Sequence, residues 1–552
     1  MQFINKSKLG VKKKREKSTS RQLFISYLWW IEDREKWYSL TWSSTLFELK
    51  DKTWKKLLKL LVDYWAFQWS KDEKEKNKEL PENLKDIDVL VVTHAHLDHI
   101  WRIPYLVKKW FKWKIYMTSL TLELAKLNWK DTISIAKADK NKASHLKKKL
   151  RDYLTIYKLH TKLKDNHLKK HEKKKIVDKL NELQNKYDIT LENVIENLEK
   201  YDIKNVSNIE NVKTSNDLLF DEEDIQKTLD LVSVVSLTDE IWVDNLLKIK
   251  FFNAGHIEGS VLSYLEFYNE NWWSYKCLIA QDLWRYNDNP LDETPSLLSN
   301  FKVNYIQLET TYAGRNHPEL KQSIEDFINA IENHEGPILI PAFAIQRTQF
   351  VVKLLLENID KFKTRQIYLT SEFAKQVSNL FVSFKREKYE YLLDKRLKFL
   401  SAKDNLPSKK LNNAIIVWSS WMLQWWSIER WAKLLVQKPN TKVIFTWYQG
   451  EWTRWREIID WKEYIVIDWK AVPVKCSYEY IKWFSSHADT EDLIHFLNSF
   501  KKWKGEKIKL ALTHWGENRY KFKYEKLQNL RKTKRKYDIF IPNLKDNLKV
   551  EF

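Results

Sequence analysis

Residues 94–99 read HAHLDH, which places four metal-ligating side chains within six positions, directly after the apolar run 89–93. An apolar run of this length, bounded by polar residues, is typical of a buried strand. The two histidines at alternate positions can face one metal ion, while Asp98 and His99 turn toward a second ion a few ångströms away. The alternative interpretation is a solvated loop that is rich in histidine. The cluster predicts a fold that brings two metal ions to the end of a strand.

Apolar runs alternate with polar turns along most of the chain, which predicts an α/β protein with layered sheets and outer helices. A length of 552 residues exceeds one ordinary hydrophobic core, so two or three packed units are expected. The predicted division is a basic N-terminal tail (1–22), a first α/β domain (23–311), a second α/β domain (312–470) and a C-terminal part (471–552) that returns to the first domain.

Positive charge is in excess, with 96 Lys and Arg against 74 Asp and Glu and a formal net charge of +22. This excess suits either a nucleic acid or an anionic membrane surface. No stretch approaches the roughly 20 apolar residues of a membrane span, and the basic N-terminus lacks an apolar signal core. We therefore expect a soluble, cytoplasmic protein without a membrane partner. Cys277 and Cys476 lack the spacing of a disulfide framework or a zinc knuckle, and we interpret both as packing residues.

Four motifs in the first domain resemble those of nucleases with the metallo-β-lactamase fold. The HAHLDH segment matches the second family motif, HxHxDH. Asp63 in LVDY matches the first, His256 in AGHIEGS matches the third, and Asp282 in AQDL matches the fourth, whose carboxylate bridges both metals in the family. An isolated Asp or His would indicate little, but these residues follow one another in the family's order.

Three further motifs resemble those that distinguish the β-CASP branch of this superfamily. Glu309 in ETTY matches motif A, His487 in FSSHAD matches motif B, and His514 in LTH matches motif C. The resemblance implies a metallo-β-lactamase αββα sandwich with an inserted β-CASP α/β domain at 312–470. Residues 100–106, with RIPYL after the metal motif, resemble the pre-mRNA 3′-end endonuclease and its prokaryotic relatives more than RNase J.

The resemblance also implies roles for these residues. It predicts two zinc ions per chain that share one carboxylate, the first held by His94, His96, His256 and Asp282 and the second by Asp98, His99, His514 and Asp282. His487 would protonate the leaving 3′ oxygen and Glu309 would orient it. Asp63 would fix the tautomer of a ligand histidine or steady the nucleophile. Asp98 counts both as a metal ligand and as a catalytic residue.

The predicted function is that of a zinc-dependent ribonuclease in RNA processing or decay, acting on single-stranded RNA. One alternative is a DNA nuclease of the same fold, although the histidine of motif C argues against it. The other is a non-catalytic RNA-binding subunit, although such subunits usually lose metal ligands and this chain keeps all seven. Endonuclease or 5′ exonuclease action, the RNA recognised and a homodimeric state are left open.

Residues 139–216 are rich in Lys, Asn, Glu and Leu, with apolar residues three and four positions apart. This pattern predicts a Lys-rich helical insert in the first domain. Two interpretations stay open for it, namely a guide for RNA and a solvated charged hairpin without a partner.

Tryptophan is abundant and glycine scarce, with 28 Trp and 8 Gly. Together they make up about 6.5% of the chain, close to the roughly 7% that glycine usually has alone. Trp occupies positions where the family has glycine: Trp29, Trp30, Trp42, Trp101, Trp284, Trp421, Trp425, Trp426, Trp447, Trp452, Trp455, Trp483 and Trp515. Tight catalytic turns need left-handed backbone or close approach, which Trp resists. We therefore expect UGA codons that are read as glycine in the native protein, with base-stacking platforms as the alternative.

Overall fold

The computed structural model describes residues 21–27, 44–64, 77–165, 167–187, 189–211, 218–286, 294–362, 365–401, 404, 406–419, 426–447, 449, 453–460, 462–467, 470–481, 487–501, 507–513, 522–527, 536–542 and 547–552. The chain consists of two compact units, residues 1–128 with 224–552 and residues 129–223.

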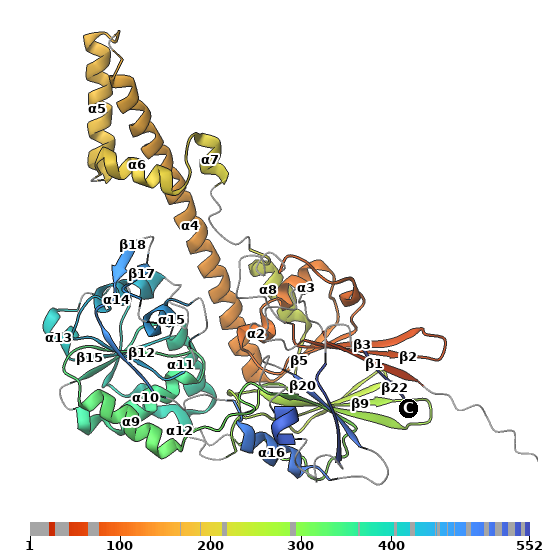
Figure 1. Ribbon diagram of the computed structural model, residues 1–552. Helices are drawn as coiled ribbons and strands as arrows, with labels where there is room; N and C mark the ends of the chain where they lie inside the picture. Colours follow the sequence, from red (N-terminus) through yellow and green to blue (C-terminus); the bar gives the residue numbers. More distant parts are fainter. Residues whose placement is uncertain are drawn as a thin grey trace, which may run out of the picture. The chain divides into compact units, whose positions relative to one another are not determined.

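The first unit contains a sandwich of two sheets (Figure 1). One sheet has the strand order β22 (Asn547–Glu551), β1 (Gln22–Tyr27), β2 (Thr45–Lys50), β3 (Lys56–Val62), β4 (Val89–Val91), β5 (Lys114–Met117) and β6 (Val232–Val234). The other has the order β21 (Tyr537–Phe540), β20 (Ile508–Thr513), β11 (Tyr305–Glu309), β10 (Ser274–Ala280), β9 (Val261–Tyr268), β8 (Leu247–Asn253) and β7 (Glu240–Val243). The last strand of the chain, β22, pairs antiparallel with β1.

A single apolar core joins the two sheets. Phe47 and Leu60 of one sheet and Phe267 and Ile279 of the other belong to the same buried cluster. Alternate residues of β1 are buried, as expected for a strand with one face on a core. Cys277 also lies in this core as a free thiol, and its burial raises its pKa well above the ordinary value. Its placement agrees with a packing role.

Helices cover both outer faces of the sandwich, which gives the αββα order (Figure 1). Beside the first sheet lie α2 (Leu97–Ile100), α3 (Ile103–Lys109) and α8 (Glu222–Leu231). On the second sheet, Leu493 and Phe496 of α16 (Thr490–Ser499) pack into the same cluster as Leu278 of β10 and Leu510 of β20. The predicted metallo-β-lactamase sandwich is therefore confirmed.

The same unit contains a further, six-stranded sheet, separate from the sandwich, in which all strand pairs are parallel. Its order is β14 (Leu397–Phe399), β13 (Gln366–Leu369), β15 (Ala414–Trp418), β12 (Ile338–Pro341), β16 (Lys442–Phe445) and β19 (Ser477–Tyr480), and β17 (Tyr464–Ile467) pairs with β18 (Lys470–Pro473) apart from it. The helices of this part are α9 (Leu320–Glu332), α10 (Arg347–Glu357), α11 (Glu372–Phe384), α12 (Arg386–Tyr389), α13 (Ser408–Asn412), α14 (Trp426–Leu435) and α15 (Arg454–Ile459).

Helices cover both faces of this parallel sheet. Ile338 and Ile340 of β12 face one buried cluster, which includes Val351 of α10, while the intervening Leu339 faces another, which includes Trp431 of α14. This two-residue alternation, with apolar residues on both sides, is the pattern of a central parallel strand. The expected second α/β domain is present.

The second unit is helical. It contains most of α4 (Ser119–Leu163), together with α5 (Lys170–Tyr187), α6 (Leu191–Lys200) and α7 (Val206–Asn211). Apolar residues of all four helices, such as Tyr153, Leu180, Val194 and Ile209, form one buried cluster. The unit therefore has a hydrophobic core of its own. Among the described residues, no helix is long and apolar enough to cross a membrane.

Candidate metal centre

The predicted site residues lie at or just beyond the ends of strands of the sandwich, with Asp98 and His99 in the short helix α2 that follows His96. Asp63 follows β3, and His94 and His96 follow the parallel strand β4. Asp282 follows β10, and Glu309 ends the parallel strand β11. Parallel strands present their carboxyl ends at one sheet edge, where sites commonly form. The two sheets are joined at this edge, because the backbone N–H of Val261 donates to the carbonyl of Thr93 at 2.9 Å.

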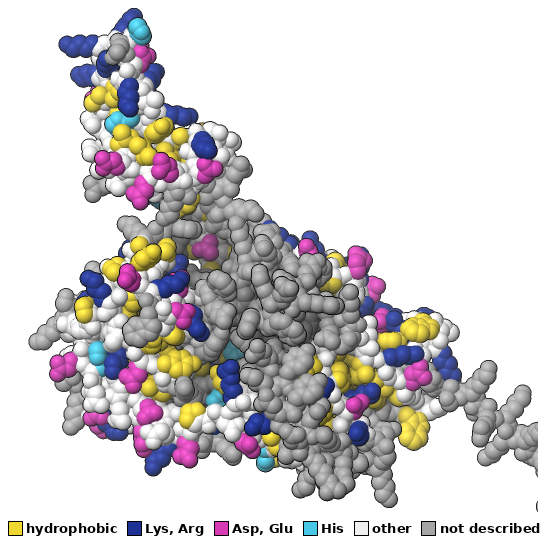
Figure 2. All heavy atoms as spheres, viewed as in Figure 1, with side chains coloured by type: hydrophobic (Ala, Val, Ile, Leu, Met, Phe, Trp, Pro, Cys, Tyr) yellow, Lys and Arg dark blue, Asp and Glu magenta, His cyan; other side chains and the backbone are white. Residues whose placement is uncertain are grey.

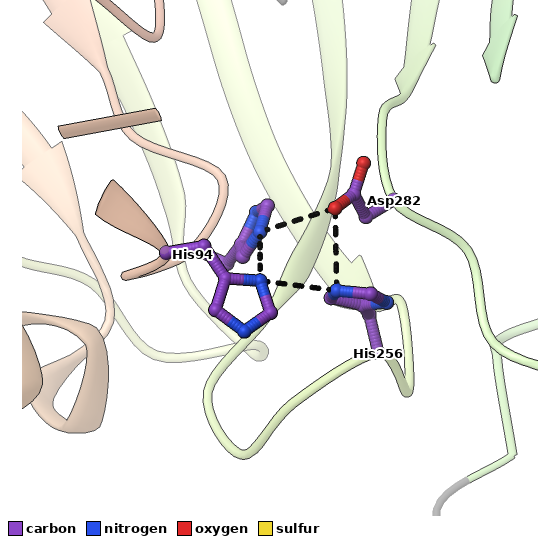
Figure 3. A group of neighbouring side chains, drawn as sticks. His94, His256 and Asp282 are labelled. Carbon is purple, nitrogen blue, oxygen red and sulfur yellow. Dashed lines mark hydrogen bonds and ion pairs between the residues drawn. The ribbon is translucent and has the colours of Figure 1, made fainter. Parts of the chain in front are cut away.

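Four of the predicted ligands converge on one point: His94, His96, His256 and Asp282. His94 Nε2 and His256 Nε2 lie 3.0 and 3.1 Å from His96 Nδ1. The same two nitrogens lie 3.4 and 3.2 Å from Asp282 Oδ2 (Figure 3). His94, His256 and Asp282 are buried, so the polar atoms face one another rather than solvent.

This donor set fits a metal ion. Tetrahedral zinc with bonds of about 2.0–2.1 Å needs ligand atoms roughly 3.3 Å apart, and the observed separations are close to that. Burial lowers the pKa of His94 and holds the pKa values of His96 and His256 well below the ordinary value. Burial opposes ionisation of Asp282, but the nearby His256 and His487 outweigh it, and its pKa lies well below its usual range. Neutral imidazoles around a carboxylate are the protonation states that a metal ligand set requires.

Beside this cluster, His99 Nε2 faces carboxylates at a second point. It lies 3.8 Å from Asp282 Oδ2 and 4.0 Å from Asp98 Oδ2. His99 is fully buried, and among the described residues this nitrogen has no hydrogen-bond partner. Although burial opposes it, the charges of Asp63, Asp98 and Asp282 raise the pKa of His99 to about 9. Two carboxylates face Nε2 and a third, that of Asp63, is bonded to Nδ1, so a cation is favoured here, and a bound metal ion would displace the proton from Nε2.

Asp63 holds His99 from behind. Its Oδ2 accepts hydrogen bonds from His99 Nδ1 at 2.8 Å and from Thr93 Oγ1 at 2.7 Å, while Oδ1 accepts from the backbone N–H of Thr93 at 2.8 Å. Asp63 is fully buried and adopts a left-handed conformation with φ of 55°. With its Nδ1 proton committed to Asp63, a neutral His99 presents a bare Nε2 toward Asp98 and Asp282.

His487 and Glu309 form a pair next to the cluster. His487 Nδ1 lies 2.9 and 3.1 Å from the two oxygens of Glu309, and its ring lies 4.8 Å from that of His256. Glu309 is fully buried and also accepts from the backbone N–H of Leu283 at 2.8 Å. Burial opposes a charge on His487, but Glu309 and Asp282 outweigh it and raise its pKa. The pair can hold a proton close to the metal ligands.

Two residues outside the metal motifs, Arg347 and His317, contact the backbone of site residues. Arg347 is buried, and its guanidinium lies 3.4 Å from the carbonyl of His256 and 4.8 Å from the Trp284 ring. Burial lowers the pKa of Arg347 to about 9, so it remains a cation at neutral pH. His317 Nε2 donates to the carbonyl of His487 at 3.1 Å and supports its loop. Arg347 is the first residue of α10, and the family resemblance reaches it through the preceding segment IPAFA at 340–344, whereas no pattern singles out His317.

His514 lies outside the described residues, as do many of the Trp positions, among them Trp29, Trp42 and Trp515. The preceding residue, Thr513, ends β20 and pairs with Glu309 of the parallel strand β11.

Comparisons with known proteins agree on one superfamily. Residues 65–167 match the metallo-beta-lactamase superfamily, residues 348–458 the Beta-Casp domain, and residues 471–542 the Zn-dependent metallo-hydrolase RNA specificity domain. The chain is 24% identical to the RNase J-like protein of Methanocaldococcus jannaschii over 76% of this chain and 80% of that protein. It is 22% identical to Ribonuclease TTHA0252 of Thermus thermophilus, over 80% and 85%. It is 21% identical to transcription termination factor FttA of Methanocaldococcus jannaschii, over 79% and 60%.

Proposed function

Because the chain belongs to the β-CASP branch of the metallo-β-lactamase superfamily, we propose that it is a zinc-dependent ribonuclease that hydrolyses RNA phosphodiester bonds. The observation that carries this proposal is the convergence of His94, His96, His256 and Asp282 beside the His487–Glu309 pair. A metal-ligand set next to a proton-holding histidine is the arrangement that metal-assisted hydrolysis requires.

The proposal includes two zinc ions per chain. The first would be held by His94, His96, His256 and Asp282, and the second by Asp98, His99, His514 and Asp282. The buried, unpartnered Nε2 of His99 among the described residues supports the second position. Bound metal ions lower the pKa of the attacking water and neutralise the charge that develops on the phosphate.

The chain's own residues supply the remaining functions. Arg347, a buried cation beside His256, would bind a non-bridging oxygen of the scissile phosphate. His487 would donate a proton from Nε2 to the leaving 3′ oxygen, since Nδ1 faces Glu309. Glu309 would keep that ring oriented, because its carboxylate is itself held by the N–H of Leu283.

RNA is favoured over DNA by the comparisons. The match at 471–542 is to an RNA specificity domain. The relatives from Methanocaldococcus jannaschii and Thermus thermophilus are named as an RNase J-like protein and a ribonuclease. We propose single-stranded RNA as the substrate, the cytoplasm as the place of action and a homodimer as the assembly, which a mass measurement in solution would distinguish from a monomer. A role in RNA processing or decay follows from this substrate.

The helical unit would bind the RNA backbone. Residues 140–186, in α4 and α5, contain 16 Lys and Arg but only 5 acidic residues, whereas residues 187–223 contain 3 and 10. In Figure 2, dark-blue side chains gather over the α4–α5 end of this unit and magenta ones lie near α6. A solvated insert without a partner would not need this separation, whereas a polyanion favours a surface of one sign.

Cleavage assays on end-labelled single-stranded RNA and DNA of the same sequence test the proposal. Zinc-loaded protein should cleave the RNA, and Asp282→Asn should abolish cleavage while keeping the fold. Metal-free protein from zinc-supplemented growth, or full activity of Asp282→Asn, would overturn it. Preferential cleavage of DNA would instead support the alternative DNA nuclease.

A further inference from the structure

Glu258 is a buried carboxylate that lies two residues after His256, and its side chain is only 1% exposed. Its Oε1 accepts a hydrogen bond from Tyr389 Oη at 2.7 Å, and its oxygens lie 2.7 Å from Lys388 Nζ and 2.6 Å from Lys385 Nζ. All three partners belong to α12 or to the residue before it. A buried carboxylate is costly unless it is paired, so these contacts define where α12 must lie.

A second contact closes a ring of hydrogen bonds around this carboxylate. The backbone N–H of Glu258 donates to Gln346 Oε1 at 3.2 Å, and Gln346 Nε2 donates to Tyr389 Oη at 3.0 Å. Gln346 is buried and adopts φ of 70°, a left-handed conformation that a residue other than glycine holds only when its surroundings require it. The residue that follows it is Arg347, whose guanidinium lies against the carbonyl of His256.

The opposite side of the same loop is clamped to the sandwich. The carbonyl of Gly259 accepts hydrogen bonds from Thr118 Oγ1 at 2.8 Å and Thr121 Oγ1 at 2.9 Å. Gly259 has φ of 85°, and a Cβ at this position would lie 3.1 Å from Leu120 Cβ and from the Thr121 backbone. The loop from His256 to Gly259 is thus fixed to the sandwich by one side and to the β-CASP helices by the other.

We infer that Glu258, through Tyr389 and Gln346, is a positioning residue that holds the β-CASP domain, and with it Arg347, in register with the metal ligand His256. The inference rests on the proposed function, because it assigns Arg347 to the RNA phosphate. Loss of the Tyr389 hydroxyl should leave the ligand cluster assembled but let Arg347 and the β-CASP loops shift relative to it.

Tyr389→Phe is the decisive variant, since it removes one hydroxyl and keeps the ring. Tyr391→Phe is its matched control, because the Tyr391 hydroxyl donates to the carbonyl of Gln349 at 3.0 Å and not to Glu258. Each zinc-loaded protein is assayed on single-stranded RNA and on bis(p-nitrophenyl) phosphate, a small diester whose phosphate would meet the metal centre and Arg347 but which is too short to contact the rest of the β-CASP cleft.

For Tyr389→Phe we expect kcat/KM on RNA to fall about 10- to 100-fold, the range for losing a hydrogen bond to a charged group. Zinc content should match the wild type, and turnover of the small diester should fall less than cleavage of RNA, because the diester depends on Arg347 but not on the other β-CASP loops. Tyr391→Phe should match the wild type on both substrates. Wild-type cleavage of RNA by Tyr389→Phe, an equal fall on both substrates, or a lowered thermal midpoint without a split between substrates would overturn the inference. Failure of the proposed function is distinct, since the wild-type protein itself would then leave RNA intact.

Discussion

Replacing Asp63 by asparagine tests whether a single buried carboxylate sets the chemistry of His99. The substitution keeps the size of the side chain, and Asn tolerates the left-handed backbone that Asp63 adopts. Asp63→Ala would instead strand three buried donors, the N–H and O–H of Thr93 and the Nδ1–H of His99. At about 1–3 kcal/mol for each donor, that loss approaches the whole stability of about 5–15 kcal/mol.

In the Asp63→Asn protein, the new side-chain amide cannot satisfy both sides. The N–H of Thr93 is a fixed donor, so the amide oxygen must take the place of Oδ1, and the NH₂ group then faces His99 Nδ1. His99 can accept that hydrogen bond only as the other tautomer, with its proton on Nε2, where it faces Asp98 and Asp282. We expect affinity for the second zinc ion to fall about 10- to 100-fold, as for other residues that orient a ligand histidine.

Zinc per chain, measured by elemental analysis after dialysis against a graded chelator, gives the readout. Asp63→Asn should lose one zinc ion before the wild type does and should retain the other at His94, His96, His256 and Asp282. Thr45→Val is a suitable control, because it removes a buried hydrogen bond to Gln307 Oε1 of 2.9 Å without touching a ligand. Equal retention of both ions by Asp63→Asn and the wild type would refute the tautomer argument.

Three other predictions concern the proton donor, the helical unit and the tryptophans. His487→Ala should keep its zinc but lose about 10²- to 10⁴-fold in turnover, partly recovered with a better leaving group; loss of zinc would make His487 a ligand. Changing the exposed Lys170, Lys174 and Lys175 to Gln should weaken RNA binding. It should also reduce the slope of log K against log salt concentration by an amount that corresponds to about two lost phosphate contacts, and an unchanged slope would favour a solvated insert. The gene should carry UGA at Trp54 and Trp272, where UGG would refute recoding.

The recoding proposal gains support from backbone geometry. Trp54, between β2 and β3, has φ of 66°, and Trp272, between β9 and β10, has φ of 61°. Glycine is the usual residue at such left-handed turn positions, where other residues cost about 1–2 kcal/mol. Among the described residues, the buried indole N–H groups of Trp284 and Trp418 have no hydrogen-bond partner, although a buried indole usually finds one. Glycine at these positions would remove both difficulties.

Local sequence was sufficient for the metal motif and the fold class. In HAHLDH the chemistry and the spacing lie within six residues, so the convergence of His94 and His96 depends on little beyond a strand that ends there. The apolar alternation of β12 and the three- and four-residue spacing in the helical insert likewise reflect local periodicity, which needs no knowledge of the partner element. Family resemblance then extended the list to His256, Asp282 and Glu309, which no local pattern would connect.

Only the tertiary structure decided which distant groups touch. His317 donates to the backbone carbonyl of His487 across 170 positions, and Tyr389 donates to Glu258 across 131. The common core of the helical unit, which joins Tyr153 of α4, Leu180 of α5 and Val194 of α6, likewise depends on how these helices pack. Contacts of this kind are set by strand pairing and by the packing of domains, because a side chain's neighbours across an interface are determined by the whole arrangement rather than by the residues beside it in the chain.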